Sequence, residues 1–427
     1  MTKRTRTALF LTCSVLFLIT APTVVFYSSG YRLDWNPQKN GKIIVQTGGF
    51  FFKAEPKQAN IFLNGKLSKK TDFFFGSALI ENLLPKDYNI KISKDGYFSW
   101  EKKLTIKEKE VTEGKRVSLI PENLNFNNIS KGVETLWPSP DDKKVVLKES
   151  ATGTNSRWSL KLYDLEKNVK SHLISENEVY SKGADFIGLE WSKDSKEIYL
   201  NVAIREQEKS FVIKPDKSPI VLTPKTIIQS PKNSVVSEKI NNELYYLDNN
   251  GNLFKNNEKL NKDPFPVKQE TGYTLYIFQE SPLSLFLKEN ENLYLFNNDL
   301  RSFEKFFDGI KGLRISPDQR KLAYFSDSEI LILFLKDRPE QPSKKAGEKI
   351  SLIRLAERIE DCVWLNSDYI IFTVGNKIRV SEIDERDRIN IVDLKEYKEP
   401  KIFFNKTNKK LYVLSEGTFY QSENIIP

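Results

Sequence analysis

The residue types that proteins use most for nucleophilic and metal chemistry are scarce in this 427-residue chain. It has one histidine, His172, and two cysteines, Cys13 and Cys362. An acyl-transfer triad needs an imidazole or an equivalent base beside its nucleophile, and no G-x-S-x-G elbow is present. Zinc sites built from His and Cys need more ligands than the chain contains. The sequence therefore predicts no catalytic, cofactor-binding or metal-ligating residue, and no cofactor.

Two kinds of oxygen-based site would contradict this prediction. Asp248 to Asn252 (D-N-N-G-N) has some calcium-loop character, but its glycine is fourth instead of sixth, and Lys259 stands where a bidentate Glu belongs. The stretch is better explained as a hairpin turn. Glycosidases need only two carboxylates. Because the chain has 57 acidic residues, a carboxylate-based glycan hydrolase remains the alternative to a non-catalytic protein.

A strand–turn–strand phrase recurs through most of the chain. Its clearest copies are Gly312–Phe325, Glu134–Leu147 and Gly188–Leu200. Each has an apolar or aromatic residue, a turn centred on Ser, Pro or Asp, and then β-branched and aromatic positions. Proline presets the backbone for a type I turn, and aspartate accepts hydrogen bonds from nearby backbone amides. Each copy therefore predicts two antiparallel strands joined by a tight turn.

Weaker copies fill the gaps between the clear ones. Counted together, the expected turn centres are Asp141, Asp194, Asn242, Pro282, Asp318, Ser367 and Asn408. Their mean spacing of about 44 residues is typical of a four-stranded propeller blade. We therefore predict a mainly β chain whose residues 132–427 form a closed β-propeller of about seven blades, with the three Asp-centred turns at equivalent places. The alternative is a sandwich of unrelated hairpins.

The N-terminal region has the pattern of a membrane anchor. Residues 1–7 contain three basic residues, and residues 8–27 form an uncharged run. Twenty helical residues span the hydrocarbon core of a bilayer. The positive-inside rule places residues 1–7 in the cytoplasm and the bulk of a single-pass chain outside the cell membrane. A cleaved signal peptide is the alternative.

Between the anchor and the propeller we expect a spacer over 28–44, a small β domain over 45–121 and a linker over 122–131. Short apolar stretches and the Asn64-Gly65 hairpin turn indicate the β domain. Within the propeller, the charged segment Lys336–Lys349 has two prolines and predicts a mobile loop inserted in a blade, which is a candidate binding lip.

The small domain resembles a PEGA domain. The resemblance is carried by Pro56 to Ala59, Asn64-Gly65, Leu84 to Tyr88, and Asp95-Gly96-Tyr97. It implies a β-sandwich-like module of bacterial surface proteins, with no catalysis attached. Gln58 departs from the pattern, since the family has glycine there, and Lys86-Asp87 replaces the glycine before Tyr88.

The repeated phrase resembles the W-S-P-D-G turn of TolB-like, WD-type propellers, again as a pattern that implies fold alone. The family glycine is replaced by Asp142, Ser195 and Gln319.

The net charge of +9 comes from 66 basic and 57 acidic residues spread along the chain, so we expect no nucleic-acid partner. Together these features predict a membrane-tethered, extracytoplasmic binding or scaffolding protein of the cell surface. Its propeller would recognise a cell-wall polymer or another surface protein.

Overall fold

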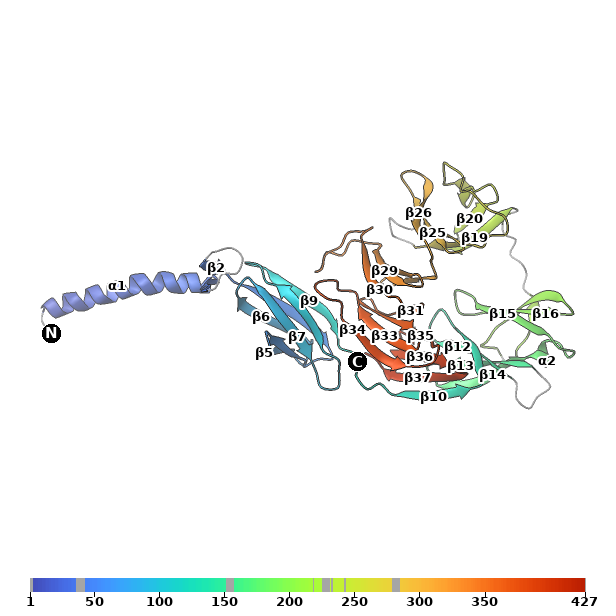
Figure 1. Ribbon diagram of the computed structural model, residues 1–427, viewed down its shortest axis with the longest axis horizontal. Helices are drawn as coiled ribbons and strands as arrows, with labels where there is room; N and C mark the ends of the chain where they lie inside the picture. Colours follow the sequence, from blue (N-terminus) through green and yellow to red (C-terminus); the bar gives the residue numbers. More distant parts are fainter. Residues whose placement is uncertain are drawn as a thin grey trace.

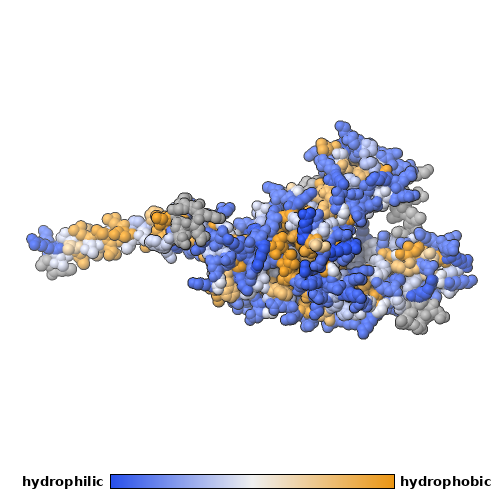
Figure 2. All heavy atoms as spheres, viewed as in Figure 1, coloured by the Kyte–Doolittle hydropathy of each residue, from blue (hydrophilic) through white to orange (hydrophobic). Residues whose placement is uncertain are grey.

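The computed structural model describes residues 3–35, 43–150, 157–217, 219–224, 231, 233–241, 243–278 and 285–426. Among them one long helix, α1 (Lys3–Ser28), projects from a body made of β-strands (Figure 1). No residue of α1 is buried, and its surface is apolar over most of its length (Figure 2). The helix is long and apolar enough to cross a membrane. A signal sequence near the N-terminus has the same length and composition.

A two-stranded sheet joins α1 to the body. Strand β1 (Tyr31–Leu33), inside the stretch expected as a spacer, pairs antiparallel with β2 (Ile44–Gln46), which begins at the last residue of that stretch. Arg32 of β1 links the sheet to α1 and to the small domain. Its guanidinium donates to the carbonyl of Tyr27 in α1 at 2.7 Å and to Oδ1 of Asn82 in the small domain at 2.8 Å. Residues 36–42 of the expected spacer lie outside the described residues.

The small domain consists of two sheets. One has the order β6–β3–β9, with β3 and β9 parallel, and the other has the order β5–β4–β7–β8. The strands are β3 (Gly48–Glu55), β4 (Asn60–Leu63), β5 (Lys66–Lys70), β6 (Ser77–Leu83), β7 (Asp87–Ser93), β8 (Trp100–Thr105) and β9 (Val111–Ser118). Alternating side chains of both sheets meet in one buried core that includes Phe50, Phe52, Ile61, Ile92 and Trp100. Packing of these inward faces explains the period-two pattern of the sequence.

The rest of the described chain forms seven four-stranded antiparallel sheets. Sheet 1 contains β11 (Val133–Pro138), β12 (Lys144–Ser150), β13 (Trp158–Asp164) and β14 (Val169–Ser175), and sheet 2 contains β15 (Asp185–Trp191), β16 (Ile198–Ile204), β17 (Gln207–Ile213) and β18 (Thr223–Pro224). Sheet 3 contains β19 (Ser234–Ile240), β20 (Glu243–Asp248), β21 (Leu253–Lys255) and β22 (Glu258–Lys259), and sheet 4 contains β23 (Tyr273–Ile277), β24 (Leu285–Glu289), β25 (Asn292–Asn297) and β26 (Ser302–Phe307). Sheet 5 contains β27 (Gly312–Ile315), β28 (Lys321–Phe325), β29 (Glu329–Phe334) and β30 (Lys349–Arg354), and sheet 6 contains β31 (Ile359–Asn366), β32 (Tyr369–Val374), β33 (Lys377–Glu382) and β34 (Ile391–Glu396). Sheet 7 contains β10 (Phe126–Lys131), β35 (Lys401–Asn405), β36 (Lys410–Ser415) and β37 (Thr418–Asn424), and one short helix, α2 (Glu176–Val179), follows β14. This succession of antiparallel sheets is a β-propeller fold.

The three Asp-centred turns occupy equivalent places, as predicted. Asp141, Asp194 and Asp318 each lie between the first and second strands of their sheets. In each turn a serine hydroxyl donates to the aspartate and accepts a backbone amide five residues after the serine, as Ser316 does from Lys321 at 2.9 Å. Ser367 and Asn408 also lie between first and second strands, whereas Asn242 and Pro282 lie outside the described residues.

The residue after each aspartate has a left-handed backbone. The φ angles are +56° at Asp142, +59° at Ser195 and +55° at Gln319. Glycine adopts this region without the steric cost that a Cβ brings. The turn geometry therefore explains why the related sequence pattern has glycine here.

The expected linker over 122–131 is corrected by the structure. Strand β10 occupies 126–131 and pairs antiparallel with β37, the last strand of the chain. Residues about 290 positions apart thus complete sheet 7, which joins the start of the propeller to its end. Pairing across such a distance leaves no local signal in the sequence, and a run rich in asparagine was read as a linker instead.

Apolar clusters join neighbouring sheets around the propeller. Separate clusters connect sheets 1 and 2, 3 and 4, 4 and 5, 5 and 6, 6 and 7, and 7 and 1. Among the described residues no such cluster spans sheets 2 and 3, where Lys193 reaches Glu238 and the carbonyl of Lys239. Figure 1 shows β19 and β20 standing apart from β15 and β16.

Candidate functional site: the junction between the small domain and the propeller

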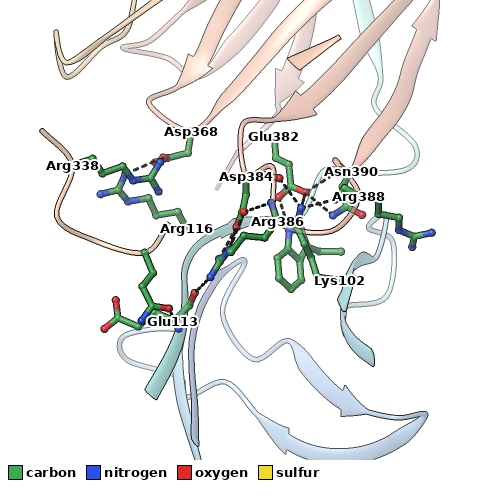
Figure 3. Close-up of polar contacts among 12 residues, drawn as sticks. Lys102, Glu113, Arg116, Arg338, Asp368, Glu382, Asp384, Arg386, Arg388 and Asn390 are labelled. Atoms are coloured by element: carbon green, nitrogen blue, oxygen red, sulfur yellow. Dashed lines mark hydrogen bonds and ion pairs between the residues drawn. The ribbon is translucent and has the colours of Figure 1, made fainter. Parts of the chain in front are cut away.

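The densest group of buried polar contacts lies where the small domain meets sheet 6 (Figure 3). Strands β8 and β9 are edge strands of the two small-domain sheets, and each bonds to the propeller, β8 through Trp100 and β9 through Ser118. The propeller side is formed by the end of β33, the loop 383–390 that follows it, and the β31–β32 turn. The junction therefore joins elements that are more than 250 residues apart in sequence.

Lys102 and Glu382 form the centre of the junction. The Nζ of Lys102 lies 2.8 Å from Oε1 of Glu382, and the two side chains are 0% and 3% exposed. Trp100 Nε1 donates to the other carboxylate oxygen, Oε2, at 2.7 Å. Asn390 donates to Oε1 through its backbone and side-chain nitrogens at 2.9 and 2.6 Å. Lys102 also donates to the carbonyl of Asp384 at 2.7 Å. Burial raises the pKa of Glu382 above its ordinary value, although Lys102 and the other donors favour its charged form.

A second set of contacts surrounds this centre. Arg386 forms a fork with Asp384, whose pKa it holds below the usual range despite burial, and donates to the carbonyl of Glu113 at 2.9 Å. Arg116 of β9 pairs with Asp368 at 2.9 Å. The fixed geometry of a guanidinium fork orients the groups that it binds. These pairs fix the orientation of the propeller relative to the small domain.

The segment Lys336–Lys349, expected as a mobile loop and a candidate binding lip, takes part in the junction. Gln341 accepts the backbone N–H of Glu113 at 3.0 Å and donates to the carbonyl of Val111 at 3.1 Å. Its side-chain amide thus pairs with the free edge of β9 as a neighbouring strand would. Inside the segment, Arg338 and Lys344 pair through their backbones. The loop is therefore part of the interdomain contact. It is inserted between β29 and β30 of sheet 5, as predicted, and its mobility stays a prediction.

The space enclosed by the junction decides what it can do chemically. The cavity between Trp100, Arg116, Asp368 and Glu382 measures about 20 Å³. That volume holds about one water molecule, whereas ligand sites measure hundreds of Å³. The carboxylates already accept hydrogen bonds from several donors. The site is suited to fixing two domains and not to holding a substrate or cofactor.

The residues singled out from the sequence lie elsewhere. His172 is on β14, the last strand of sheet 1, where Nε2 lies 2.7 Å from Glu178 and the side chain is 44% exposed. Cys13 is exposed on α1, Cys362 is buried in β31, and both are free. Burial raises the pKa of the Cys362 thiol. Asp248 accepts the backbone amides of Asn250 and Asn252 in the turn between β20 and β21, as expected of a hairpin. The structure brings none of these four residues together.

A hydrolase that works in the centre of the propeller would need two carboxylates on the innermost strands, which are the first strands of the sheets. Contacts between β27 and β31 and between β31 and β35 indicate that these strands lie on the inside of the propeller. Glu134 bonds to Lys148, Asp185 pairs with Arg157 at 2.8 Å, and Asp361 pairs with Arg314 at 3.1 Å. Burial raises the pKa of Asp361. Each of these three acids is engaged by a cation.

Sequence reasoning missed the residues of the junction. Lys102, Glu382 and Asn390 are common types in unremarkable positions, and only their meeting in space makes them a site. A partial signal was the alternation in Trp100–Thr105, where a lysine falls on the buried face of a strand. A lysine at such a position requires an anionic partner.

Comparisons with known proteins found distant structural similarity alone. No protein-family model and no curated protein matches the chain. Among solved structures, the β-propeller domain of Cps50 (Swd1) from Myceliophteria thermophila is 14% identical and covers 71% of this chain and 99% of its own, with a TM-score of 0.38. YCF48 from Cyanidioschyzon merolae is 8% identical over 70% of this chain and 98% of its own (TM-score 0.41), and the Dos1 propeller is 13% identical over 70% and 94% (TM-score 0.37). The class of protein defined here is a β-propeller protein with an N-terminal apolar helix.

Proposed function

We propose that the chain is a membrane-anchored, extracytoplasmic binding or scaffolding protein without catalytic activity. In this proposal α1 is the anchor, the small domain is a stalk, and the propeller is a recognition head for a cell-wall polymer or a surface protein. The observation that carries it is the buried Lys102–Glu382 junction. A stalk fixed to its head by a shielded ion pair presents the head in one orientation, which suits a scaffold.

We further propose that the small domain is of the PEGA type. Gln58, at the family's glycine position, has a φ of +59°, and the Asn64-Gly65 turn has left-handed φ at both residues. These are the backbone conformations that the glycine and Asn-Gly positions of the pattern require. In the same way, the seven sheets support one ring of seven blades of the TolB-like type, in which sheet 7 is completed by β10.

Fractionation of cells that express the full chain tests the anchor. We expect the protein to remain in the membrane after carbonate extraction and to keep its N-terminal residues on sequencing, because α1 exposes apolar side chains along its length. A cysteine introduced at exposed Leu300 should react with an impermeant maleimide in intact cells. A soluble product that begins near Tyr31 would identify a signal peptide and contradict the anchor.

A further inference from the structure

The two-stranded sheet after α1 has one apolar face that is open to solvent. Leu33 of β1 pairs with Ile44 of β2, so both side chains lie on the same face, and they are 50% and 60% exposed. Trp35, two residues after Leu33, continues this row and is 85% exposed. Transfer of such side chains out of water is favourable, so a row of them marks a surface that another body covers.

The opposite face of this sheet is turned toward the small domain. Asp34 and Val45 alternate with the apolar row and are only 8% and 5% exposed. Arg32, which pairs with Val45 in the register of the sheet, donates to Oδ1 of Asn82 on β6 at 2.8 Å. The backbone pairing extends to Asp34, whose amide donates to the carbonyl of Ile43 at 2.8 Å. The sheet is therefore held in one orientation, with its apolar face outward.

The sheet is also fixed to the end of α1. Strand β1 begins at Tyr31, three positions after Ser28, the last residue of the helix. The guanidinium of Arg32 donates to the carbonyl of Tyr27, and its central carbon lies 3.4 Å from the centroid of the Tyr27 ring. The rings of Tyr31 and Phe26 meet edge to face, with centroids 5.3 Å apart. Because Phe26 is exposed on α1, the apolar surface of the helix continues through Tyr31 onto the outward face of the sheet.

This continuity selects a bilayer surface as the body that covers the apolar face. The uncharged run of α1, residues 8–27, is as long as the hydrocarbon core of a bilayer is thick. If α1 crosses a bilayer, β1 and β2 begin where the hydrocarbon ends. Figure 1 shows β2 at the end of α1, on the side of the small domain away from the propeller. Indole rings are enriched at this depth, because the ring is apolar and its N–H remains hydrated.

We propose that the β1–β2 sheet lies in the interfacial layer of the bilayer that α1 crosses, with Leu33, Trp35 and Ile44 inserted among the lipid head groups. The sheet is then a second membrane contact beside the helix. Arg32 ties the sheet both to α1 and to β6, so a sheet seated on the bilayer fixes the angle between the small domain and the membrane. The inference rests on the proposed anchor.

The test uses the full chain in phosphatidylcholine vesicles that contain a lipid with a doxyl quencher near its head group. A nitrobenzoxadiazole label is placed on Ile44→Cys in a Cys13→Ser background, where the remaining thiol, Cys362, is buried. The matched control is Phe74→Cys, an apolar position of the same domain that is 74% exposed. Phe74 lies before Ser77, at the start of β6, whereas Arg32 binds Asn82 near the other end of that strand.

We expect strong quenching at residue 44 and weak quenching at residue 74. Adding Leu33→Ser and Trp35→Ser should remove most of the quenching at residue 44, while the chain still floats with the vesicles because α1 is unchanged. A chain that floats but shows equal quenching at both positions would overturn the inference and leave the anchor intact. So would quenching at residue 44 that the serine variants do not reduce, because the label would then be near the bilayer only through its tether. A chain that fails to float would overturn both.

Discussion

Lys102 and Glu382 form an ion pair that is shielded from water on both sides. Removing one partner leaves the other buried without a countercharge, which costs about 3–5 kcal/mol. We therefore expect Lys102→Met to lower the free energy of unfolding of the full chain by about that amount. Burial raises the pKa of Glu382, so the folded chain binds the proton of its carboxyl group more tightly than the unfolded chain does. In Lys102→Met the lone carboxylate is charged at neutral pH and neutralised by a proton in acid. The loss of unfolding free energy should therefore be larger at neutral than at acidic pH.

Urea titration of Lys102→Met and of the matched control Lys103→Met checks this prediction. Lys103 is the neighbouring lysine, 57% exposed and 3.5 Å from Asp87, so Lys103→Met should change stability by less than about 0.5 kcal/mol. The double variant Lys102→Met/Glu382→Gln should recover much of the loss, because no lone charge then stays buried. Equal effects of the two single variants would contradict a role for the buried pair.

His172 provides the opposite case at the same scale. Its side chain is half exposed, and its contacts are to Glu178 and Lys161 on the surface of sheet 1. An exposed pair of this kind adds little stability. His172→Ala should cost at most about 1 kcal/mol in a thermal or urea titration and leave partner binding unchanged. Loss of binding in this variant would point to a functional site on sheet 1.

At the scale of single elements, two substitutions in the turn after β27 can distinguish backbone strain from the loss of side-chain contacts. Gln319 has a left-handed φ, where any Cβ meets the neighbouring backbone. Gln319→Gly removes that clash, and Gln319→Ala keeps it. We expect the glycine variant to be about 1 kcal/mol more stable than the alanine variant by urea titration. The reverse order would show that the flexibility of glycine in the unfolded chain outweighs the strain.

The loop between β5 and β6, which contains Phe73, Phe74 and Phe75, depends on the carboxylate of Asp72. Hydrogen bonds from the backbone amide of Phe75 and the hydroxyl of Ser77, with weaker contributions from the amides of Ser77 and Phe74, hold the pKa of Asp72 well below its usual range. A carboxyl of lowered pKa stabilises the folded loop above its ordinary pKa, and that contribution is lost only as the solution becomes strongly acidic. Asp72→Ala should speed hydrogen exchange at all three amides. Asp72→Asn keeps one acceptor oxygen and should spare Phe74 and Phe75 more than Ser77, whereas unchanged exchange in both would contradict the assignment.

Elements with local signals could be predicted, and those that depend on distant partners could not. The turns at Asp141 and Asp318 follow from proline and aspartate chemistry within four residues, and the turn at Asp194, which has Lys193 in place of proline, follows from serine and aspartate alone. Strand β10 has no local signal because its partner, β37, is about 290 residues away. The polar composition of Lys336–Lys349 predicts an inserted loop but does not reveal that Gln341 binds β9. The junction depends on which common charged residues meet, and composition carries no such information.

At the scale of the whole molecule, most contacts join sheets that are consecutive in sequence, and a few join the start of the chain to its end. Most sheets that are consecutive in sequence share apolar clusters, so most of the propeller core is local. Three contacts join distant parts of the chain: β10 with β37, sheet 7 with sheet 1, and the small domain with sheet 6. The first and the third draw the region that precedes the propeller onto its last two sheets. The small domain is thereby held by the C-terminal part of the propeller.

The boundary between sheets 2 and 3 is where we expect the propeller to open first. Among the described residues no apolar cluster spans it, and Lys193 bridges it through Glu238 and the carbonyl of Lys239. An ion pair near the surface contributes far less than a buried apolar cluster. We therefore expect native-state hydrogen exchange to be faster in β15–β18 and β19–β22 than in sheets 5 to 7. Lys193→Ala should increase that difference.

Lys196→Ala is the matched control for this last prediction. Lys196 lies in the same turn but pairs within it, with Asp194 at 3.8 Å, and makes no bridge to sheet 3. Its removal should leave the exchange pattern unchanged. If both variants speed exchange equally, the turn and not the bridge controls the boundary. If Lys193→Ala speeds exchange uniformly in all sheets, the propeller opens as one cooperative unit, and the boundary has no separate stability.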